Sequence, residues 1–271
     1  MIRFPNAKIN LGLRVLDKRD DGFHNIETIF YPVTLSDALE IVPSEFAKHS
    51  FTYTGLAIPP SSKNLCEKAI ELLSENYAVP PLKLHLHKHI PLEAGLGGGS
   101  SDAACCLLML NDLFQFGINE QEMMQYAAKL GSDCPFFIPN KASFAAGRGD
   151  ELSDIDLELP GYYIRIIKPA VSVSTAEAYR NLSGESKKVS LRDVVMDTDP
   201  ACWKNALSND FEKYVFHRFP EIGKIKEQLY QEGAFYASLS GSGTAVFGLF
   251  EKLPARETSN KSCFVWDGKL I

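Results

Sequence analysis

The segment of residues 91–104 constrains the fold of this chain more than any other, because four glycines and then two serines fall within it. It follows an alternating strand-like segment, residues 82–88, and leads into an apolar helix-like segment, residues 103–114. Glycines let the backbone approach an anion closely, and the start of a helix adds free amide donors. The pattern therefore predicts a loop that binds the phosphates of a nucleotide.

This glycine loop matches neither of the two common phosphate-binding loops. A P-loop requires Gly-Lys followed by Ser or Thr, and no lysine follows these glycines. The dinucleotide fingerprint requires a further glycine where Ser100 stands and a suitably placed acidic partner, so an NAD-binding oxidoreductase is disfavoured. The simplest alternative is a turn in which Ser100 or Ser101 caps a helix, but a single cap does not require four glycines.

The composition is that of an ordinary globular protein, with 45% hydrophobic and 23% charged residues among 271. The formal net charge of −6 provides no basic field to attract nucleic acid. The six cysteines show neither a CxxC pair nor metal-ligand spacing, which fits a reducing compartment. The first residues do not resemble a signal peptide, and no apolar run reaches transmembrane length. We expect a soluble, cytoplasmic protein that binds neither nucleic acid nor membranes.

Hydrophobic periodicity predicts strands and helices without a strict βαβ alternation, which favours the α+β class in two halves. The predicted strands cover residues 7–15, 26–32, 39–42, 51–54, 82–88, 162–167, 234–239, 244–250 and 263–266. The predicted helices cover residues 65–77, 101–114, 119–131 and 220–233. Capping boxes are predicted at Asn119–Glu122 and Ser174–Glu177. The second half begins around Pro160, so we expect one domain over residues 1–158 and another over residues 159–271.

Three motifs follow one another along the chain. They are Pro5-Asn-Ala-Lys8-Ile-Asn10-Leu-Gly-Leu, the glycine loop of residues 91–104, and Ser240-Gly-Ser-Gly243-Thr-Ala. In this order they resemble the motifs of the superfamily of galactokinase, homoserine kinase, mevalonate kinase and phosphomevalonate kinase. The resemblance implies an α+β, two-domain small-molecule kinase with an N-terminal ATP-binding domain, a C-terminal domain and an active site in the cleft between them. It leaves the contacts of the loop 240–243 open.

Three further details point to one family within that superfamily. They are Gly95-Leu-Gly-Gly-Gly-Ser-Ser-Asp-Ala-Ala, Asp21-Gly-Phe-His-Asn-Ile-Glu-Thr28 and Gly131-Ser-Asp-Cys-Pro-Phe-Phe137. Together they resemble the 4-diphosphocytidyl-2-C-methyl-D-erythritol kinases of the non-mevalonate route to isoprenoids. The resemblance implies ATP-dependent phosphorylation of the 2-hydroxyl of that small cytidine diphosphate compound. It also implies ATP and Mg²⁺ as cofactors, and it leaves a monomer and a homodimer both open.

Asp133 and Lys8 are the predicted catalytic residues. An alcohol is a weak nucleophile that a carboxylate can orient and deprotonate, and the resemblance places the catalytic aspartate of the family at Asp133. From the residues alone, Asp133 before Cys-Pro also suits a helix N-cap. The resemblance places the catalytic lysine at Lys8, where it can pair with Asp133 and stabilise the transferring charge. From the strand alone, Lys8 equally suits an exposed edge.

The nucleotide-binding residues are predicted from the glycine loop and from the resemblance. The hydroxyls of Ser100 and Ser101 can donate to phosphates, or one of them can lie near Mg²⁺, so the metal ligands stay open. The resemblance adds Asn64 and Lys88 as adenosine contacts, which from the residues alone suit a helix cap and a strand end. The full predicted set is Asn64, Lys88, Pro91, Leu92, Glu93, Ala94, Gly95, Leu96, Gly97, Gly98, Gly99, Ser100 and Ser101.

The substrate-binding residues are predicted to be Asn10, Phe23, His24 and Tyr179. An aromatic face can stack on a pyrimidine, and histidine offers directional hydrogen bonds to its polar edge. The resemblance places Phe23 and His24 on the cytosine, Tyr179 on its opposite face, and Asn10 at the sugar-alcohol end. The alternative is that Phe23 and Tyr179 are core aromatics.

Two other functions stay open at this point. A superfamily kinase acting on mevalonate or homoserine is disfavoured, because neither alcohol carries a base for the aromatic residues of segment 21–28 to hold. A nucleotide or metabolite sensor without catalysis is disfavoured by the presence of both Lys8 and Asp133. The alternating histidines of residues 85–89 favour a solvated strand face over a metal site.

Overall fold

The computed structural model describes residues 1–46, 48–59, 64–182, 189–255 and 263–270. The chain forms two compact units, and neither is a single stretch of sequence. The first unit comprises Met1–Ala7, Leu35–Leu92 and Gly97–Lys141, and the second comprises Lys8–Thr34, Glu93–Leu96 and Ala142–Ile271. Because the compact units interleave along the chain, the domain boundary after residue 158 stays a prediction.

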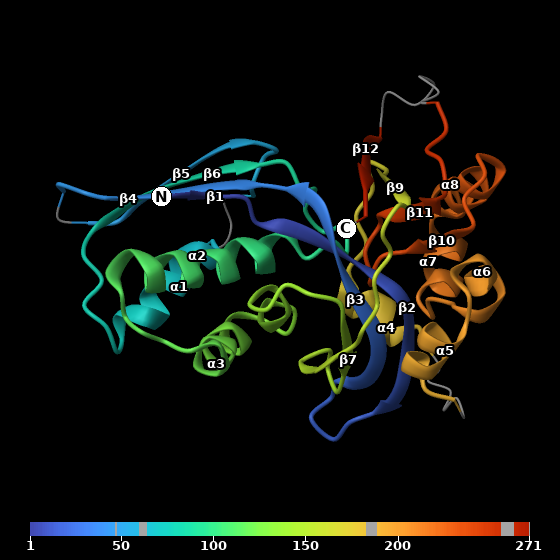
Figure 1. Cartoon of the computed structure of the whole chain (residues 1–271), viewed down its shortest axis with the longest axis horizontal. Helices are drawn as coiled ribbons and strands as arrows, with labels where there is room; N and C mark the ends of the chain where they lie inside the picture. Colours follow the sequence, from blue (N-terminus) through green and yellow to red (C-terminus); the bar gives the residue numbers. More distant parts are fainter. Residues whose placement is uncertain (47, 60–63, 183–188, 256–262, 271) are drawn as a thin grey trace. The chain divides into compact units, whose positions relative to one another are not determined.

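The first unit contains a four-stranded sheet in the order β1-β4-β6-β5 (Figure 1). Its strands are β1 (Ile2–Arg3), β4 (Ala38–Pro43), β5 (Ser50–Gly55) and β6 (Leu82–Lys88). β5 runs parallel to β6, and the other neighbouring strands are antiparallel. Leu84 and Leu86 are buried whereas His87, between Leu86 and Lys88, is exposed, so β6 follows the period-two pattern of its sequence.

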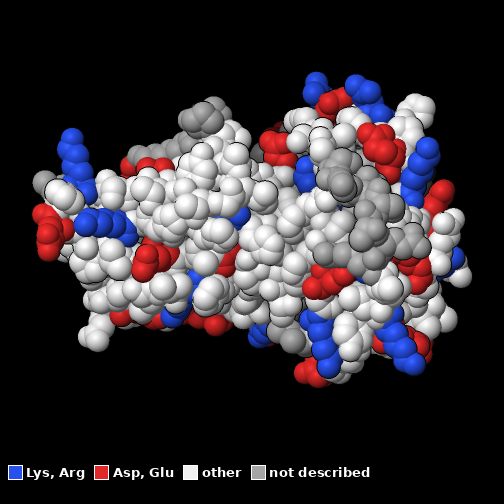
Figure 2. Space-filling model, turned by 90° about the horizontal axis from the view of Figure 1, so that it is seen from above, with Lys and Arg blue, Asp and Glu red and all other residues white. Residues whose placement is uncertain are grey.

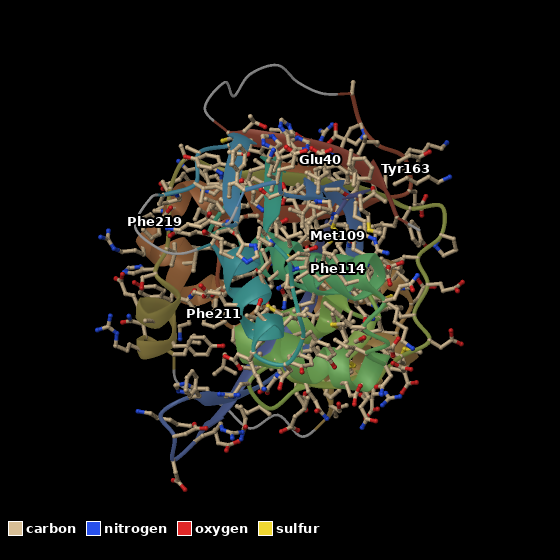
Figure 3. All side chains as sticks on the ribbon, turned by 90° about the vertical axis from the view of Figure 1, so that its left-hand side faces the viewer. Glu40, Met109, Phe114, Tyr163, Phe211 and Phe219 are labelled. Atoms are coloured by element: carbon tan, nitrogen blue, oxygen red, sulfur yellow. The ribbon has the colours of Figure 1, made fainter. Side chains whose placement is uncertain are left out.

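Helices cover one face of this sheet (Figure 1). They are α1 (Leu65–Ser74), α2 (Gly98–Phe114), α3 (Glu120–Leu130) and the short 3-10 helix η1 (Cys134–Phe137). Met109 of α2 is fully buried, whereas Glu40 of β4 is exposed (both labelled in Figure 3). α2 is buried along most of its length, which explains its almost continuously apolar sequence.

The second unit contains two four-stranded sheets, in the orders β2-β3-β7-β8 and β10-β11-β9-β12. The first is formed by β2 (Asn6–Lys18), β3 (His24–Ser36), β7 (Ser143–Ala146) and β8 (Glu151–Asp154). The second is formed by β9 (Tyr163–Lys168), β10 (Tyr236–Leu239), β11 (Val246–Phe250) and β12 (Phe264–Lys269), and its neighbouring strands are all antiparallel.

Short helices complete the second unit. They are α4 (Thr175–Arg180), α5 (Leu191–Asp197), η2 (Pro200–Cys202), α6 (Trp203–Ala206), α7 (Glu212–Arg218) and α8 (Pro220–Gln231). A cluster of buried apolar side chains joins sheets and helices, among them Leu13 of β2, Ile167 of β9, Val215 of α7 and Leu229 of α8. This core holds the strand that carries the predicted residues Lys8 and Asn10.

The predicted α+β mixture of helices and strands is confirmed. The capping box at Asn119 is confirmed by both reciprocal bonds with Glu122. At Ser174 the side chain accepts from the amide of Glu177, which is half of the predicted box. α2 begins at Gly98 rather than at residue 101, because the glycines themselves form its first turn.

None of the helices in the described ranges combines the length and the apolar character needed to cross a membrane. On the face of the molecule drawn in Figure 2, Lys and Arg side chains are interspersed with Asp and Glu. The described residues on that face therefore form no extended patch of one sign.

Candidate active site

The glycine loop connects β6 to α2, and its conformation requires several of its glycines. Gly95 and Gly97 have φ values of 78° and 70°, in the left-handed region that residues with a Cβ disfavour. A Cβ on Gly95 would also meet the carbonyl oxygen of Ser240 at 1.8 Å. A Cβ on Gly98 would lie 3.0 Å from Nζ of Lys88. The run of glycines is thus a steric requirement of this loop.

The start of α2 lies inside the glycine run, with Gly97 as its N-cap. The amide of Ser101 donates to the carbonyl of Gly97 at 2.9 Å, and no side chain in the described part of the chain caps the helix. The interpretation of Ser100 or Ser101 as the cap is therefore wrong, because both lie inside the helix. The first amides of a helix have no partner within it, so this end offers donors to an anion such as phosphate.

Two other predicted motifs meet the glycine loop inside the second unit, which contains loop residues 93–96. The hydroxyl of Ser240 donates to the carbonyl of Gly95 at 2.8 Å. The amide of Lys8 donates to the carbonyl of Leu96 at 3.0 Å. Two segments that are far apart in the sequence therefore contact the same loop.

Lys8 is buried, with 3% of its surface exposed. Its Nζ donates to Oδ1 of Asn10 at 2.6 Å and lies 4.7 Å from the centre of the Phe30 ring. Nδ2 of Asn10 donates to Oγ1 of Thr28 at 2.9 Å, and Thr28 donates to the carbonyl of Gly12 at 2.6 Å. The interpretation of Lys8 as an exposed edge-strand lysine is therefore wrong, and fixed contacts hold its ammonium in place.

Asp133 belongs to the first unit and immediately precedes η1. Its side chain makes no capping hydrogen bond to η1, although Pro135 stands in the first turn as a helix start favours. Oγ of Ser132 donates to Oδ1 of Asp133 at 3.4 Å. Asp133 therefore occupies the N-cap position of η1, as its sequence context suggests, but its side chain makes no capping bond to this helix.

Two of the predicted base-binding residues, His24 and Tyr179, contact each other in the second unit. The rings of His24 and Tyr179 are stacked, with centroids 5.4 Å apart and planes inclined by 22°. Tyr179 also meets the buried ring of Phe211 edge-on at 4.9 Å, so the core sets its position. Phe23 is 56% exposed, and the interpretation of Phe23 as a core aromatic is wrong.

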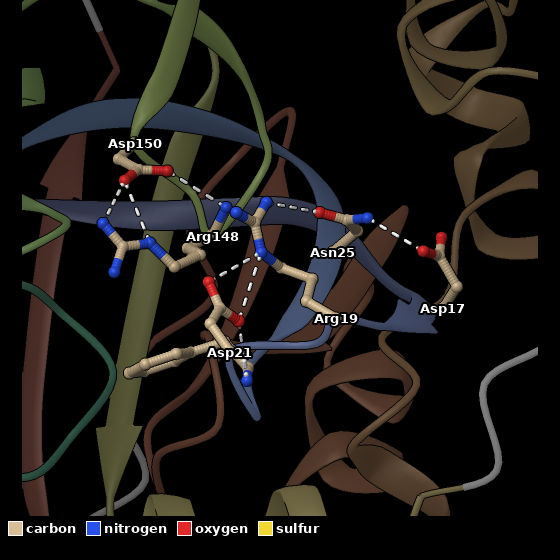
Figure 4. Close-up of polar contacts among 7 residues, drawn as sticks. Asp17, Arg19, Asp21, Asn25, Arg148 and Asp150 are labelled. Carbon is tan, nitrogen blue, oxygen red and sulfur yellow. Dashed lines mark hydrogen bonds and ion pairs between the residues drawn. The ribbon is translucent and has the colours of Figure 1, made fainter.

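A chain of polar contacts holds the loop that carries Phe23 (Figure 4). Nε of Arg19 donates to Oδ2 of Asp21 at 3.1 Å, and Nη1 of Arg19 donates to Oδ1 of Asn25 at 3.0 Å. Oδ1 of Asp21 accepts from the amide of Phe23 at 3.1 Å. This hydrogen bond, together with the neighbouring Arg19, lowers the pKa of Asp21. The loop is therefore shaped by its own side chains.

Arg148, which sequence reasoning missed, lies over the ring of Phe23, with its guanidinium carbon 5.3 Å from the ring centre. Nη2 of Arg148 donates to Oδ2 of Asp150 at 2.7 Å, and the amide of Arg148 donates to Oδ1 of Asp150 at 3.0 Å (Figure 4). Burial opposes ionisation of Asp150, but the bonds from Arg148 outweigh it and lower the pKa of Asp150. One face of the exposed Phe23 ring is thus covered by a cation. An arginine between two glycines was the only sign of this in the sequence.

Asn64 is the N-cap of α1. Its Oδ1 accepts from the backbone amide of Cys66 at 2.8 Å, and its own backbone amide donates to Oε2 of Glu67 at 3.1 Å. A Cβ on Gly99 would lie 3.8 Å from the side chain of Leu65, so α1 and α2 begin side by side. The capping interpretation of Asn64 is therefore correct, and the cap lies next to the glycine loop.

Lys88 is buried on the core face of β6, the face that Leu84 and Leu86 share. Its Nζ donates to Oδ2 of Asp102 at 2.7 Å and also to Oδ2 of Asp37. Burial alone would lower the pKa of Lys88, but the two carboxylates outweigh it and raise that pKa. Burial raises the pKa of Asp102 to about 7, against the opposing effect of Lys88. Sequence reasoning missed both aspartates, although an acid in an apolar helix is a signal of a buried partner.

Two family models match the chain. The model of the GHMP kinases N terminal domain matches residues 64–140, and that of the GHMP kinases C terminal domain matches residues 191–264. The chain is 48% identical over 273 residues to the 4-diphosphocytidyl-2-C-methyl-D-erythritol kinase of Parabacteroides distasonis, with 100% of both chains covered. These matches agree with the resemblance that the three motifs indicate.

Solved structures agree with the sequence matches. A crystal structure of 4-(cytidine 5'-diphospho)-2C-methyl-D-erythritol kinase matches with a TM-score of 0.81 at 30% identity, covering 100% of this chain and 99% of that one. The mevalonate kinase of Methanococcus jannaschii matches with a TM-score of 0.73 at 14% identity, covering 100% and 98%. The second likeness concerns the fold alone, and it confirms the predicted superfamily fold.

Proposed function

The chain belongs to the family of 4-diphosphocytidyl-2-C-methyl-D-erythritol kinases, and on that premise we propose that it transfers a phosphoryl group from ATP to the 2-hydroxyl of 4-diphosphocytidyl-2-C-methyl-D-erythritol. This reaction belongs to the non-mevalonate, or methylerythritol phosphate, route of isoprenoid precursor synthesis. The observation that carries the proposal is the start of α2, where a glycine loop opens into a helix without a side-chain cap. Such a helix start suits the phosphates of a nucleotide.

Asn64, Lys88 and Pro91–Ser101 are proposed to bind ATP. The amides of the first turn of α2 would hold the phosphates, and the serine hydroxyls would add donors. The adjacent starts of α1 and α2 support a part for Asn64, because its position next to the loop suits a nucleotide that continues past the phosphates.

Lys8 and Asp133 are proposed as the catalytic residues. Asp133 would orient the 2-hydroxyl and accept its proton, and Lys8 would stabilise the charge on the transferring phosphoryl group. The burial of Lys8 and its contacts with Asn10 and Phe30 support this role, because catalysis by a cation requires a fixed position. For Asp133 the support is its place in the motif 131–137, immediately before η1.

Phe23, His24 and Tyr179 are proposed to hold the cytosine, and Asn10 the sugar-alcohol end. The exposure of Phe23 supports this role, because its ring can stack on a pyrimidine, and the contact between His24 and Tyr179 supports a shared position for these two residues. The hydrogen bond between Asn10 and Lys8 supports a position for Asn10 near the transferred group.

Mg²⁺ is proposed as the second cofactor. Within the described ranges, no three His, Cys, Asp or Glu side chains gather into a group that could hold a metal by themselves. Mg²⁺ nevertheless fits this chain, because it keeps several waters and takes much of its coordination from substrate phosphates. The loop 95–101 would therefore hold the ion through the phosphates that it binds, and the ion would neutralise their charge.

The organisation of the enzyme is also a proposal. We place a domain boundary after residue 158, and the support is that the N-terminal family model ends at 140 and the C-terminal model begins at 191. A cytoplasmic location is supported by the six free cysteines, four of which are buried. The enzyme would act as a monomer or a homodimer on a small molecule, without a nucleic-acid or membrane partner.

The test is ADP release from MgATP with 4-diphosphocytidyl-2-C-methyl-D-erythritol, with mevalonate and homoserine in parallel. We expect turnover with the cytidine compound alone. Turnover with mevalonate or homoserine would support a kinase but contradict the proposed cytosine site. No turnover with any of the three alcohols would overturn the proposed reaction.

A further inference from the structure

Three buried charged residues of the first unit form a cluster beneath the glycine loop. Nζ of Lys88 bridges Oδ2 of Asp102, at 2.7 Å, and Oδ2 of Asp37. The side chains are almost completely buried, with exposed fractions of 1% for Lys88, 0% for Asp37 and 3% for Asp102. Two carboxylates therefore share one ammonium out of contact with water.

The cluster reaches both ends of the glycine loop. Oδ1 of Asp37 accepts from the amides of His89 and Ile90, at 2.5 and 2.8 Å, which are the first residues after β6. Asp102 lies on the second turn of α2, the helix that the loop enters. Asp37 therefore binds both the start of the loop and Lys88, and Lys88 in turn binds Asp102 of α2, the helix that follows the loop.

The first residue of α2 rests directly on this cluster. A Cβ on Gly98 would lie 3.0 Å from Nζ of Lys88 and 2.8 Å from the side chain of Ile90. Gly98 is therefore needed for the backbone of the helix start to approach the ammonium. The first amides of α2, which have no partner within the helix, thus lie close to the buried charges.

The arrangement is energetically unfavourable in one respect. Oδ1 of Asp102 is buried and has no hydrogen-bond partner within the described part of the chain. Burying such an oxygen has a desolvation cost, and an apolar side chain at this place would avoid it. Fold stability alone therefore does not explain the second carboxylate.

We propose that the Asp37–Lys88–Asp102 cluster is a clamp that fixes the start of α2 relative to the end of β6, so that the amides of the glycine loop are already in position for the phosphates of the nucleotide. Asp102 is a positioning residue that acts through Lys88 and does not touch the nucleotide. Lys88 likewise contributes to ATP binding from beneath the loop. The inference rests on the proposed function in that the ligand of the loop is ATP.

The test compares Asp102→Ala with Asp102→Asn. Alanine removes the bond from Lys88 to Asp102 but leaves the ion pair of Asp37 and Lys88, which carries no net charge, so the protein should fold. Asparagine retains an oxygen that accepts from Lys88. A matched control is Asp112→Asn, on the same helix, because Asp112 pairs with Arg3 at the surface.

Calorimetric titration with MgATP should show binding about tenfold weaker in Asp102→Ala, as expected for the loss of one charge-assisted bond. Binding by Asp102→Asn and Asp112→Asn should stay within about threefold of the original protein. The KM for the alcohol substrate should not change in any of them, and the unfolding midpoint of Asp102→Ala should not fall.

Unchanged MgATP binding by Asp102→Ala would overturn the clamp, and so would an asparagine variant as weak as the alanine variant. A lower unfolding midpoint with unchanged nucleotide affinity would show a merely structural role. If the original protein itself bound no MgATP, the proposed function would fail together with the clamp, whereas failure of the clamp alone leaves that binding intact.

Discussion

Two regions of the molecule use ion pairs in opposite ways. In the first unit, the clamp beneath the glycine loop is buried, and its Lys88 side chain is only 1% exposed. In the second unit, the pairs at the predicted base-binding loop lie in water, with Arg148 44% exposed and Asp21 43% exposed. Water screens an exposed pair, whereas removing one partner of a buried pair leaves an uncompensated charge.

This difference suggests different tasks. A buried clamp would fix, before any ligand arrives, the backbone that is proposed to bind phosphates. The exposed pairs shape the Phe23 loop with weak contacts, each worth little on its own, so that a bound base can supply much of the final order. We therefore expect large effects from changes in the first region and modest effects on substrate affinity from changes in the second.

The largest expected effect is on the chemical step. Asp133→Ala should reduce kcat about a thousandfold, because it removes the group that is proposed to orient the hydroxyl and accept its proton. MgATP affinity measured by calorimetry should stay within about twofold, since the phosphate-binding backbone is untouched. Ser132→Ala, which removes the neighbour that donates to Asp133, is the control. Normal turnover by Asp133→Ala would contradict the proposed role of Asp133 as the general base.

The comparison itself is tested by removing one cation from each region. Lys88→Met should lower the free energy of unfolding by about 3–5 kcal/mol, because two carboxylates stay buried without their counter-ion. Arg19→Met should lower it by about 1 kcal/mol or less. Urea denaturation of both variants measures these values. Equal losses would mean that burial does not distinguish the two regions.

The buried carboxylate also predicts a pH dependence. Burial raises the pKa of Asp102 to about 7, far above the value of an aspartate in an unfolded chain. Between these two values the folded state holds a proton that the unfolded state has lost, so this group reduces stability as pH rises through that window. Asp102→Asn removes the effect, and its stability relative to the original protein should increase by about 2 kcal/mol from about pH 5 to about pH 8. A pH-independent difference in urea midpoints would contradict this assignment.

In the second region, His24→Ala should raise the KM for the cytidine compound about tenfold, because it removes the ring stacked on Tyr179 and a directional hydrogen-bonding group. The KM for MgATP should not change. Initial-rate measurements with each substrate varied in turn separate the two constants. An unchanged KM for the cytidine compound would return His24 to a structural role.

The smallest expected effect is at Arg148. Arg148→Ala should raise the KM for the cytidine compound about threefold, because an exposed cation–π contact on Phe23 is weak. Arg148→Lys should fall between the two proteins, since it keeps the charge but loses the flat guanidinium. A change in the KM for MgATP instead would place Arg148 outside the base-binding region.

Much of the local structure could be predicted from the sequence. β6 follows its alternating pattern, and α3 begins at the capping box of Asn119 because the side chains that satisfy its first amides are adjacent in sequence. The start of α2 could not be predicted in this way. Glycine has a low helix propensity, so propensity alone does not predict a helix that begins at Gly98. The tertiary structure requires glycine at this position, because a Cβ would collide with Ile90 and with the buried Lys88.

The candidate site divides in the same way. The motifs around Lys8, the glycine loop and Asp133 indicate phosphoryl transfer through their resemblance to the motifs of the kinase superfamily. The sequence left Lys8 open between an exposed edge and a buried position, and the structure decides for burial because β2 packs into the second unit. Arg148 was missed because its contact with Phe23 joins residues that are distant in the chain.

The sequence by itself determined the α+β class and the glycine loop, because short-range patterns specify strands, helices, caps and phosphate-binding turns. It indicated a kinase through the resemblance of its motifs to those of a known superfamily. It even places Lys88 on the same strand face as Leu84 and Leu86. Only the tertiary structure decided that Lys88 is a buried cation bonded to two carboxylates. Asp37 and Asp102 come from other elements, and a charge can be buried only where such long-range partners meet it.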